Sequence, residues 1–174
     1  MACSAISVAN SLIKKAKERG IKDLTPMKLQ KLVYFAHAWM LAIDERPLIN
    51  ETVKAWKFGP VIDSVYHEFK TYGAKNIDSF GTEFDLIDID DNSGVPDVGF
   101  ITPYVDRSDT KAHSVMDAIL DTYGDKSATF LSNLTHALDS AWSITRKEHN
   151  DGSQRGFVID DEIIKAAMKR KLGL

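Results

Sequence analysis

The residues best suited to chemistry are a hydroxyl, an imidazole and a carboxylate that lie close together in sequence. Thr135 and His136 are followed by Asp139 and Ser140. A hydrolase needs a nucleophile, a base and an orienting acid that converge in space, and neighbours in sequence around a helix end rarely do so. We therefore expect capping and turn hydrogen bonds from these side chains, and a small hydrolase centred on His136 ranks last among the functional alternatives.

A second candidate for chemistry is an acidic run with part of a calcium-loop spacing. Asp88, Asp90 and Asn92 match the first three ligand positions of such a loop. Ser93 stands where glycine is needed for the turn, and Gly99 stands where a bidentate glutamate is needed. The missing features are those that close the site, so the sequence predicts an acidic loop and no metal.

The remaining histidines, at positions 37, 67, 113 and 149, are not grouped by their spacing. His37 stands two positions before Trp39 in a largely apolar run, which favours a hydrogen-bonded core or boundary histidine over a ligand. The chain has no glycine-rich phosphate loop, no HExxH and no pair of Cys-x-x-Cys motifs. We predict no catalytic residue, no metal site, no cofactor and no enzymatic activity.

Length and composition favour one domain over residues 1–174 in the cytoplasm. The chain contains no run of 18 apolar residues and no basic leader followed by an apolar region, so neither a membrane span nor a signal peptide is expected. The single cysteine, Cys3, cannot form an internal disulfide.

Charge is distributed unevenly along the chain. Residues 1–75 hold 12 Lys and Arg against 7 Asp and Glu, a balance of +5. Residues 76–106 hold 8 acids and no Lys or Arg, whereas residues 107–174 hold 10 of each sign. The acidic segment is either a solvated loop or a surface complementary to a basic partner, and it disfavours strong nucleic-acid binding.

Hydrophobic spacing predicts helices through most of the chain. Apolar residues recur at helical intervals from Ile6 to Ala16. A second helix is expected to begin at Pro26 behind a Thr25 cap, to run to Ile43, and to point Lys28 and Lys31 away from its apolar face. Further helices are expected from Pro60 to Tyr72, with Gly73 as a left-handed cap, and at 115–123, 128–136 and after an Asp160 cap with an Ile159 and Ile164 staple. Trp142 is expected to anchor a turn.

Two non-helical stretches complete the prediction. Residues 52–58 alternate like a short strand that ends at Gly59 and Pro60. Residues 76–106 are rich in Gly, Pro and Asp without a sustained helical period, so we expect a loop with at most a small hairpin. The fold class is therefore mainly α, with a helical N-terminal part (1–75), an acidic loop or hairpin region (76–106) and a helical C-terminal part (107–174).

The connector at residues 56–60 is the predicted interaction site. A short extended segment between helices cannot hide both of its faces, and an exposed Trp or Phe is a strong interface anchor. We therefore predict that a protein partner binds the connector and the acidic segment, at Trp56, Lys57, Phe58, Gly59, Pro60, Asp85, Asp88, Asp90 and Asp91.

Three motifs resemble one known family. KLQKLVYFAHAW, AWKFGPV and SVYHEFKTYG are similar to the Panacea antitoxin domain, a SocA-like domain of toxin–antitoxin operons and prophages, and the later LSNLTHALDSAWSITRK segment extends the resemblance. It implies a non-enzymatic antitoxin that binds and neutralises a toxin encoded in the same operon, one that blocks translation or growth. No catalytic residues come with the family.

One alternative within that resemblance is a proteolytic adaptor. Such a protein would deliver its client to a protease, with residues 168–174 as an exposed handle. The chain carries no obvious added DNA-binding domain, which leaves transcriptional autoregulation by this chain alone without support.

Overall fold

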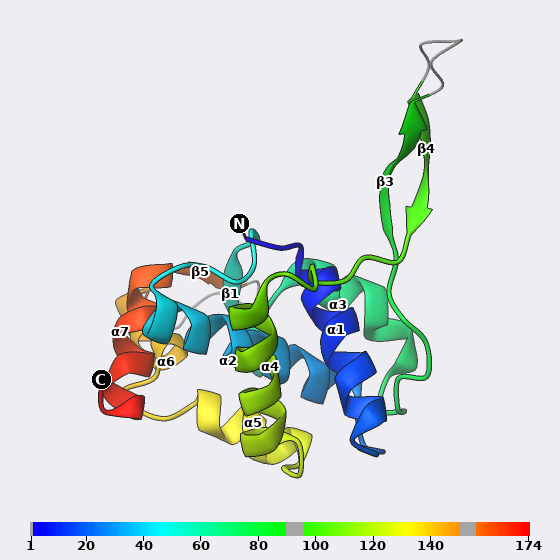
Figure 1. The fold of residues 1–174 in the computed structure, drawn as a ribbon. Coiled ribbons are helices and arrows are strands. Elements are labelled where there is room, and N and C mark those ends of the chain that lie inside the picture. Colours follow the sequence, from blue (N-terminus) through cyan, green and yellow to red (C-terminus); the bar gives the residue numbers. More distant parts are fainter. Residues whose placement is uncertain (1, 90–95, 150–155) are drawn as a thin grey trace.

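The computed structural model of the protein describes residues 2–89, 96–149 and 156–174 (Figure 1). The helices are α1 (Ala5–Glu18), α2 (Pro26–Asp44), α3 (Asp63–Phe69) with the 3₁₀ turn η1 (Lys70–Tyr72), α4 (Thr110–Tyr123), α5 (Ala128–Thr135), α6 (Ala141–Glu148) and α7 (Asp161–Leu172). The strands are β1 (Val53–Trp56), β2 (Gly59–Val61), β3 (Glu83–Ile89), β4 (Pro96–Ile101) and β5 (Phe157–Ile159). The mainly α class with minor strands is confirmed.

Helix α2 is the centre of the molecule. It begins as the sequence predicts, because the Thr25 hydroxyl accepts the N–H of Lys28 and Pro26 occupies the first turn. The helix packs against α7, α4, α1 and α5, and nearly all of its side chains from Lys28 to Ala42 are buried. No helix within the described residues is long and apolar enough to cross a membrane.

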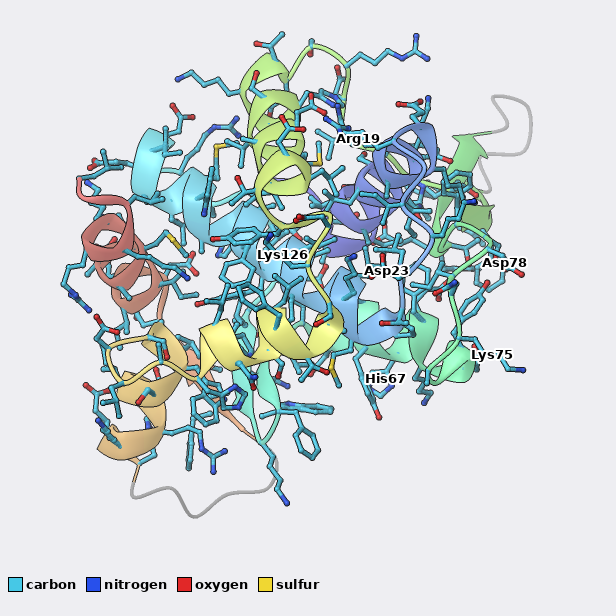
Figure 2. The ribbon with its side chains drawn as sticks, turned by 90° about the horizontal axis from the view of Figure 1, so that it is seen from below. Arg19, Asp23, His67, Lys75, Asp78 and Lys126 are labelled. Atoms are coloured by element: carbon cyan, nitrogen blue, oxygen red, sulfur yellow. The ribbon has the colours of Figure 1, made fainter. Side chains whose placement is uncertain are left out.

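The predicted outward direction of two lysines on α2 is wrong. Lys28 is 0 % exposed and Lys31 is 2 % exposed. Lys28 Nζ donates to Asp23 Oδ1 at 2.6 Å and to the carbonyl of Gly124 at 2.8 Å. Asp23 and Lys126, labelled in Figure 2, mark the two loops that receive this ammonium group. The carbonyl of Gly124 and the carboxylate of Asp23 therefore stabilise the buried charge of Lys28, which the hydrophobic pattern alone assigns to the surface.

A three-stranded antiparallel sheet in the order β2-β1-β5 joins distant parts of the chain. Trp56 pairs with Gly59 across the tight turn, and Lys54 pairs with both Val61 and Val158. Pro60 lies in β2, so its predicted place in a helix is wrong; α3 begins later, at Asp63. Gly73 ends the turn after α3 with a positive φ of 58°, but its ψ of −114° is not the left-handed helical value.

Strands β3 and β4 form a separate two-stranded antiparallel sheet that stands out from the helical body (Figure 1). We call these two strands the arm. The predicted hairpin in the acidic segment is thus present, with strands of seven and six residues. A register shift between Leu86 and Asp88 marks a β-bulge in β3.

The C-terminal helices depart from the prediction at two points. Helix α4 begins at Thr110, where Asp109 accepts the N–H of Ala112. Trp142 lies inside α6 and does not form a turn. The predicted cap of α7 is confirmed, because Asp160 accepts the N–H of Glu162, and the two staple residues Ile159 and Ile164 are both buried.

Candidate functional site

A groove of about 640 Å³ lies beside the turn between β1 and β2. This volume is within the usual range for sites that bind ligands or the side chains of a partner. The turn forms one wall, and α2 and α3 form the others. We call it the connector groove; its lining residues are Pro26, Met27, Gln30, Lys31, Trp56, Lys57, Phe58, Val61, Val65, Tyr66, Lys70 and Gly73.

Exposed apolar side chains surround the connector groove. Phe58 is 66 % exposed at the tip of the turn, and Met27 and Tyr66 are 45 % and 41 % exposed. The rings of Trp56 and Tyr66 meet edge to face with centroids 4.9 Å apart, which fixes the wall between turn and helix. Aromatic side chains with restricted rotamers lose little entropy on binding, so this wall suits an interface.

The turn is held from behind by hydrogen bonds to its carbonyl groups. Trp142 Nε1 donates to the carbonyl of Trp56 at 2.7 Å, and Ser132 Oγ donates to that of Phe58 at 3.2 Å. His136 Nε2 lies 3.3 Å from the carbonyl of Lys57. The turn therefore presents Phe58 on a fixed backbone, and α5 and α6 act as its support.

Gly59 is required at the base of this turn. Its φ is +106°, and a Cβ atom there would lie 2.6 Å from Thr135 Oγ1 and 2.7 Å from Lys31 Nζ. A side chain at this position would be strained and would displace Lys31. The sequence motif Phe-Gly-Pro thus reflects close packing of the turn on α2 and α5.

Lys31 forms the floor of the connector groove. Its Nζ donates to the carbonyl of Pro60 at 3.0 Å. Burial lowers the pKa of this ammonium group to about 7, since no carboxylate accompanies it in the groove lining. Lys57 and Lys70 also line the groove, so its walls combine aromatic surface with cationic side chains.

Two buried polar atoms of the lining lack hydrogen-bond partners among the described residues. They are Gln30 Oε1 and Trp56 Nε1. Gln30 Nε2 donates to the carbonyl of Ile62 at 2.9 Å, and this leaves Gln30 Oε1 without a hydrogen-bond donor in the described part of the chain. An incoming segment with apolar groups, a carboxylate and backbone polar atoms matches this lining.

The structure separates the predicted interaction residues into two places. Trp56, Lys57 and Phe58 line the connector groove, whereas Gly59 and Pro60 are buried beneath it. Asp85 is exposed on the arm, and Asp88 belongs to β3. Asp90 and Asp91, with Asn92 and Ser93 of the calcium-like spacing, lie outside the described residues. Helix α3 lies between connector and arm in both views (Figures 1 and 2).

Sequence reasoning missed the part of the groove that α2 and α3 supply, namely Met27, Gln30, Lys31, Tyr66 and Lys70. The burial of Lys31 could have been inferred from the sequence, because Lys31 stands four residues before the apolar Phe35 and therefore on the same helical face; Phe35 is buried. A lysine in that position has a buried stem and must find a polar partner for its amine.

The residues around His136 serve as caps and supports. Nδ1 of His136 lies 2.6 Å from the carbonyl of Ser132, and Thr135 Oγ1 donates to the same carbonyl at 2.6 Å. Ser140 Oγ accepts the N–H of Ser143 as the cap of α6 and donates to the carbonyl of Thr135. These contacts are the capping and turn hydrogen bonds that the sequence predicts.

His37 is a core histidine, also as predicted. It is 0 % exposed, its Nδ1 accepts the N–H of Ile49 at 3.4 Å, and its Nε2 lies 3.1 Å from Asp161 Oδ1. The first contact places the proton on Nε2, which then donates to the carboxylate at the start of α7. Within the described residues no three His, Cys, Asp or Glu side chains gather as a metal site.

Comparison with known proteins identifies the family. The family model "Antitoxin SocA-like, Panacea domain" matches residues 29–143. The chain is 34 % identical to Antitoxin SocA of Caulobacter vibrioides (strain NA1000 / CB15N) over 161 residues, which cover 92 % of this chain and 80 % of that protein. No solved structure matches significantly. With most of the motif-bearing helix α2 and all of the connector and α5 inside the matched range, the chain belongs to the SocA-like antitoxin family of Panacea domains.

Proposed function

We propose that this protein is an antitoxin that neutralises a partner toxin by direct protein–protein binding, with the connector groove as a contact site. Membership of an antitoxin family supports the class of function and points to a role without catalysis. The main support for this contact site is Phe58. Its aromatic side chain is 66 % exposed, and the carbonyl of the same residue accepts a hydrogen bond from Ser132 on α5.

The mechanism follows from the chemistry of the groove. An apolar side chain of the toxin buries against Phe58, Tyr66 and Met27, and a toxin carboxylate lies among Lys57, Lys70 and Lys31. Charge-assisted hydrogen bonds in a partly enclosed site are stronger than those between neutral groups. Because the turn is already ordered, binding costs little conformational entropy at this wall.

Co-expression tests the proposal. The toxin is the product of the gene adjacent to this one, expressed alone and together with the antitoxin in a growth assay. Wild type restores growth, whereas Phe58→Ala weakens binding of the purified toxin by about thirtyfold, as loss of a ~2 kcal/mol interface anchor would. Leu138→Ala is the matched control, since Leu138 is 81 % exposed on a turn away from the groove.

The outcomes separate the mechanisms. Failure of the wild type to restore growth contradicts the antitoxin function, and full rescue by Phe58→Ala moves the contact away from the connector groove. Toxin abundance in the rescued cells distinguishes occlusion, in which it stays constant, from delivery to a protease, in which it falls. The proposed handle for delivery, residues 168–174, is mostly helical because α7 extends to Leu172. Its first residue, Met168, is buried.

A further inference from the structure

The root of the arm is fixed by one buried side chain. Asn10 on α1 is 0 % exposed. Its Nδ2 donates to the carbonyls of Gly81 and Pro103 at 2.9 and 2.8 Å, and its Oδ1 accepts the N–H of Gly81 at 2.7 Å. Gly81 precedes β3 and Pro103 follows β4, so both ends of the arm are attached to the same amide. The fold therefore presents the arm at a defined place on its surface.

One face of the arm is apolar and exposed. The register pairs Phe84 with Phe100 and Leu86 with Val98. The two phenyl rings meet edge to face at 5.5 Å, yet Phe84 remains 64 % and Phe100 75 % exposed. Leu86 and Val98 are 56 % and 48 % exposed. Contiguous apolar surface of this kind on a soluble protein marks an interaction site.

The arm also carries uncompensated negative charge. It lies within the 76–106 segment, which has 8 acids and no Lys or Arg. Asp85 is exposed between Phe84 and Leu86. Positive charge from outside the segment would balance this negative charge.

Charge decides which occupant fits the apolar face. Two arms from two copies of the chain would bring like charges together, and the phosphates of nucleic acids or anionic membranes would be repelled. A protein surface with an apolar centre and Lys or Arg at its rim satisfies both features of the arm. This occupant fits the apolar side chains and the carboxylates at once.

We infer that the arm is a second docking element that covers a basic, apolar-centred surface of the toxin, an inference that rests on the proposed antitoxin function. Proteins that act on nucleic acids present Lys and Arg to phosphate. The acidic arm therefore occupies the kind of surface through which such a toxin binds its target. The cationic connector groove and the anionic arm together set the orientation of the partner.

The test uses the full chain and the purified toxin from the co-expression assay. Phe84→Thr combined with Phe100→Thr removes the two phenyl rings of the apolar face and keeps strand propensity. Asp85→Lys reverses the charge at the residue between Phe84 and Leu86, whose side chain lies on the opposite face of the strand. The controls lie on an exposed turn of the helical body: Leu138→Thr replaces an exposed apolar residue by threonine, and Asp139→Lys makes the same charge reversal. Unchanged circular dichroism and thermal melting establish that each variant is folded.

The expected result is a loss of affinity in both arm variants. The double threonine variant binds the toxin more than tenfold more weakly, and Asp85→Lys both weakens binding and flattens its dependence on salt concentration. The controls stay within about twofold of wild type, well below the effect of an interface anchor. A photoreactive residue in place of Phe84 crosslinks to a Lys-rich or Arg-rich surface of the toxin.

Two failures are distinguishable. Wild type that neither binds the toxin nor restores growth overturns the antitoxin function and the docking role of the arm together. Wild type that binds and restores growth while the arm variants match its affinity overturns the arm alone. Crosslinks that map to an acidic surface of the toxin also overturn it.

Discussion

At the scale of single residues, the least expected feature is the environment of Lys31. Its amine is buried beside Gly59 and Pro60, with the carbonyl of Pro60 as its hydrogen-bond acceptor. An unfolded lysine keeps its proton up to a pKa of 10.5, whereas burial lowers the folded pKa to about 7. Between these two values the unfolded state binds more protons, so the free energy of unfolding rises with pH in this window.

Lys31→Met should remove that dependence. Wild type gains at most about 1.4 kcal/mol of stability per pH unit from this group between about pH 7 and pH 9.5, and the variant loses this gain. Denaturant unfolding across the window measures the slope. Lys57→Met, at an exposed lysine of the same groove, should keep the wild-type slope; an equal slope in Lys31→Met would show that the amine stays protonated when folded.

At the scale of elements, the arm depends on Asn10 of α1. Asn10→Ala leaves one buried N–H and two carbonyls without their partner, and each unsatisfied group costs about 1–3 kcal/mol. We expect a loss of about 3 kcal/mol in unfolding free energy. Relative to wild type, amide exchange should accelerate more in β3 and β4 than in α2. Hydrogen exchange followed by mass spectrometry measures this difference.

Asn133→Ala, at an exposed position of α5, is the control for that experiment. It should leave exchange in the arm unchanged. Wild-type exchange rates in the Asn10→Ala arm would mean that the root is held by other contacts, such as the bond from the Val105 N–H to Ser11 Oγ.

The sequence predicts regular elements well and fails where tertiary contacts decide. Thr25 and Pro26 specify the start of α2 because capping is local. The Gly, Pro and Asp content of residues 76–106 predicts a loop with at most a small hairpin, and the strands are hard to see in the sequence because the bulge after Leu86 interrupts their alternation of apolar and polar residues. Strand β5 was missed because three residues carry no periodic signal, and their pairing with β1 is a long-range contact.

The candidate site was predictable only in part for the same reason. The exposed aromatic residue of the connector follows from the short segment between helices. The burial of Lys31 and the support from Trp142 require knowing that α2 and α6 each contact the same turn. Local sequence contains no information about these long-range contacts.

At the scale of the whole molecule, ion pairs attach α4 to the two N-terminal helices. Arg46 donates to Asp44 and to Asp109, each at 2.7 Å, and Asp117 receives Lys15 and Arg19 at 2.9 and 2.7 Å. Burial raises the pKa of Asp109, but the Ala112 N–H and the Arg46 guanidinium outweigh it, so the pKa falls below its ordinary value. Hydrogen bonds from Lys111 and Arg46 lower the pKa of Asp44.

Acid should therefore loosen these contacts. A carboxylate with a depressed folded pKa stabilises the fold above the unfolded pKa of 3.8 and loses that contribution as the pH falls through the folded value. We expect Arg46→Met to lower the melting temperature at neutral pH, with a deficit that shrinks in acid. Lys126→Met, which removes an exposed pair with Asp125, should change little at either pH. A deficit independent of pH would assign the loss to packing of the arginine stem.

The attachment of the arm does not depend on the side chains of the arm itself. Asn10 bonds only to backbone atoms of Gly81 and Pro103, so the clamp is indifferent to the residues between them. A hairpin of different sequence can be exchanged between these two points without altering the helical body that holds it. The hairpin is thus a replaceable insert, since substitutions between Gly81 and Pro103 leave the three hydrogen bonds of Asn10 in place.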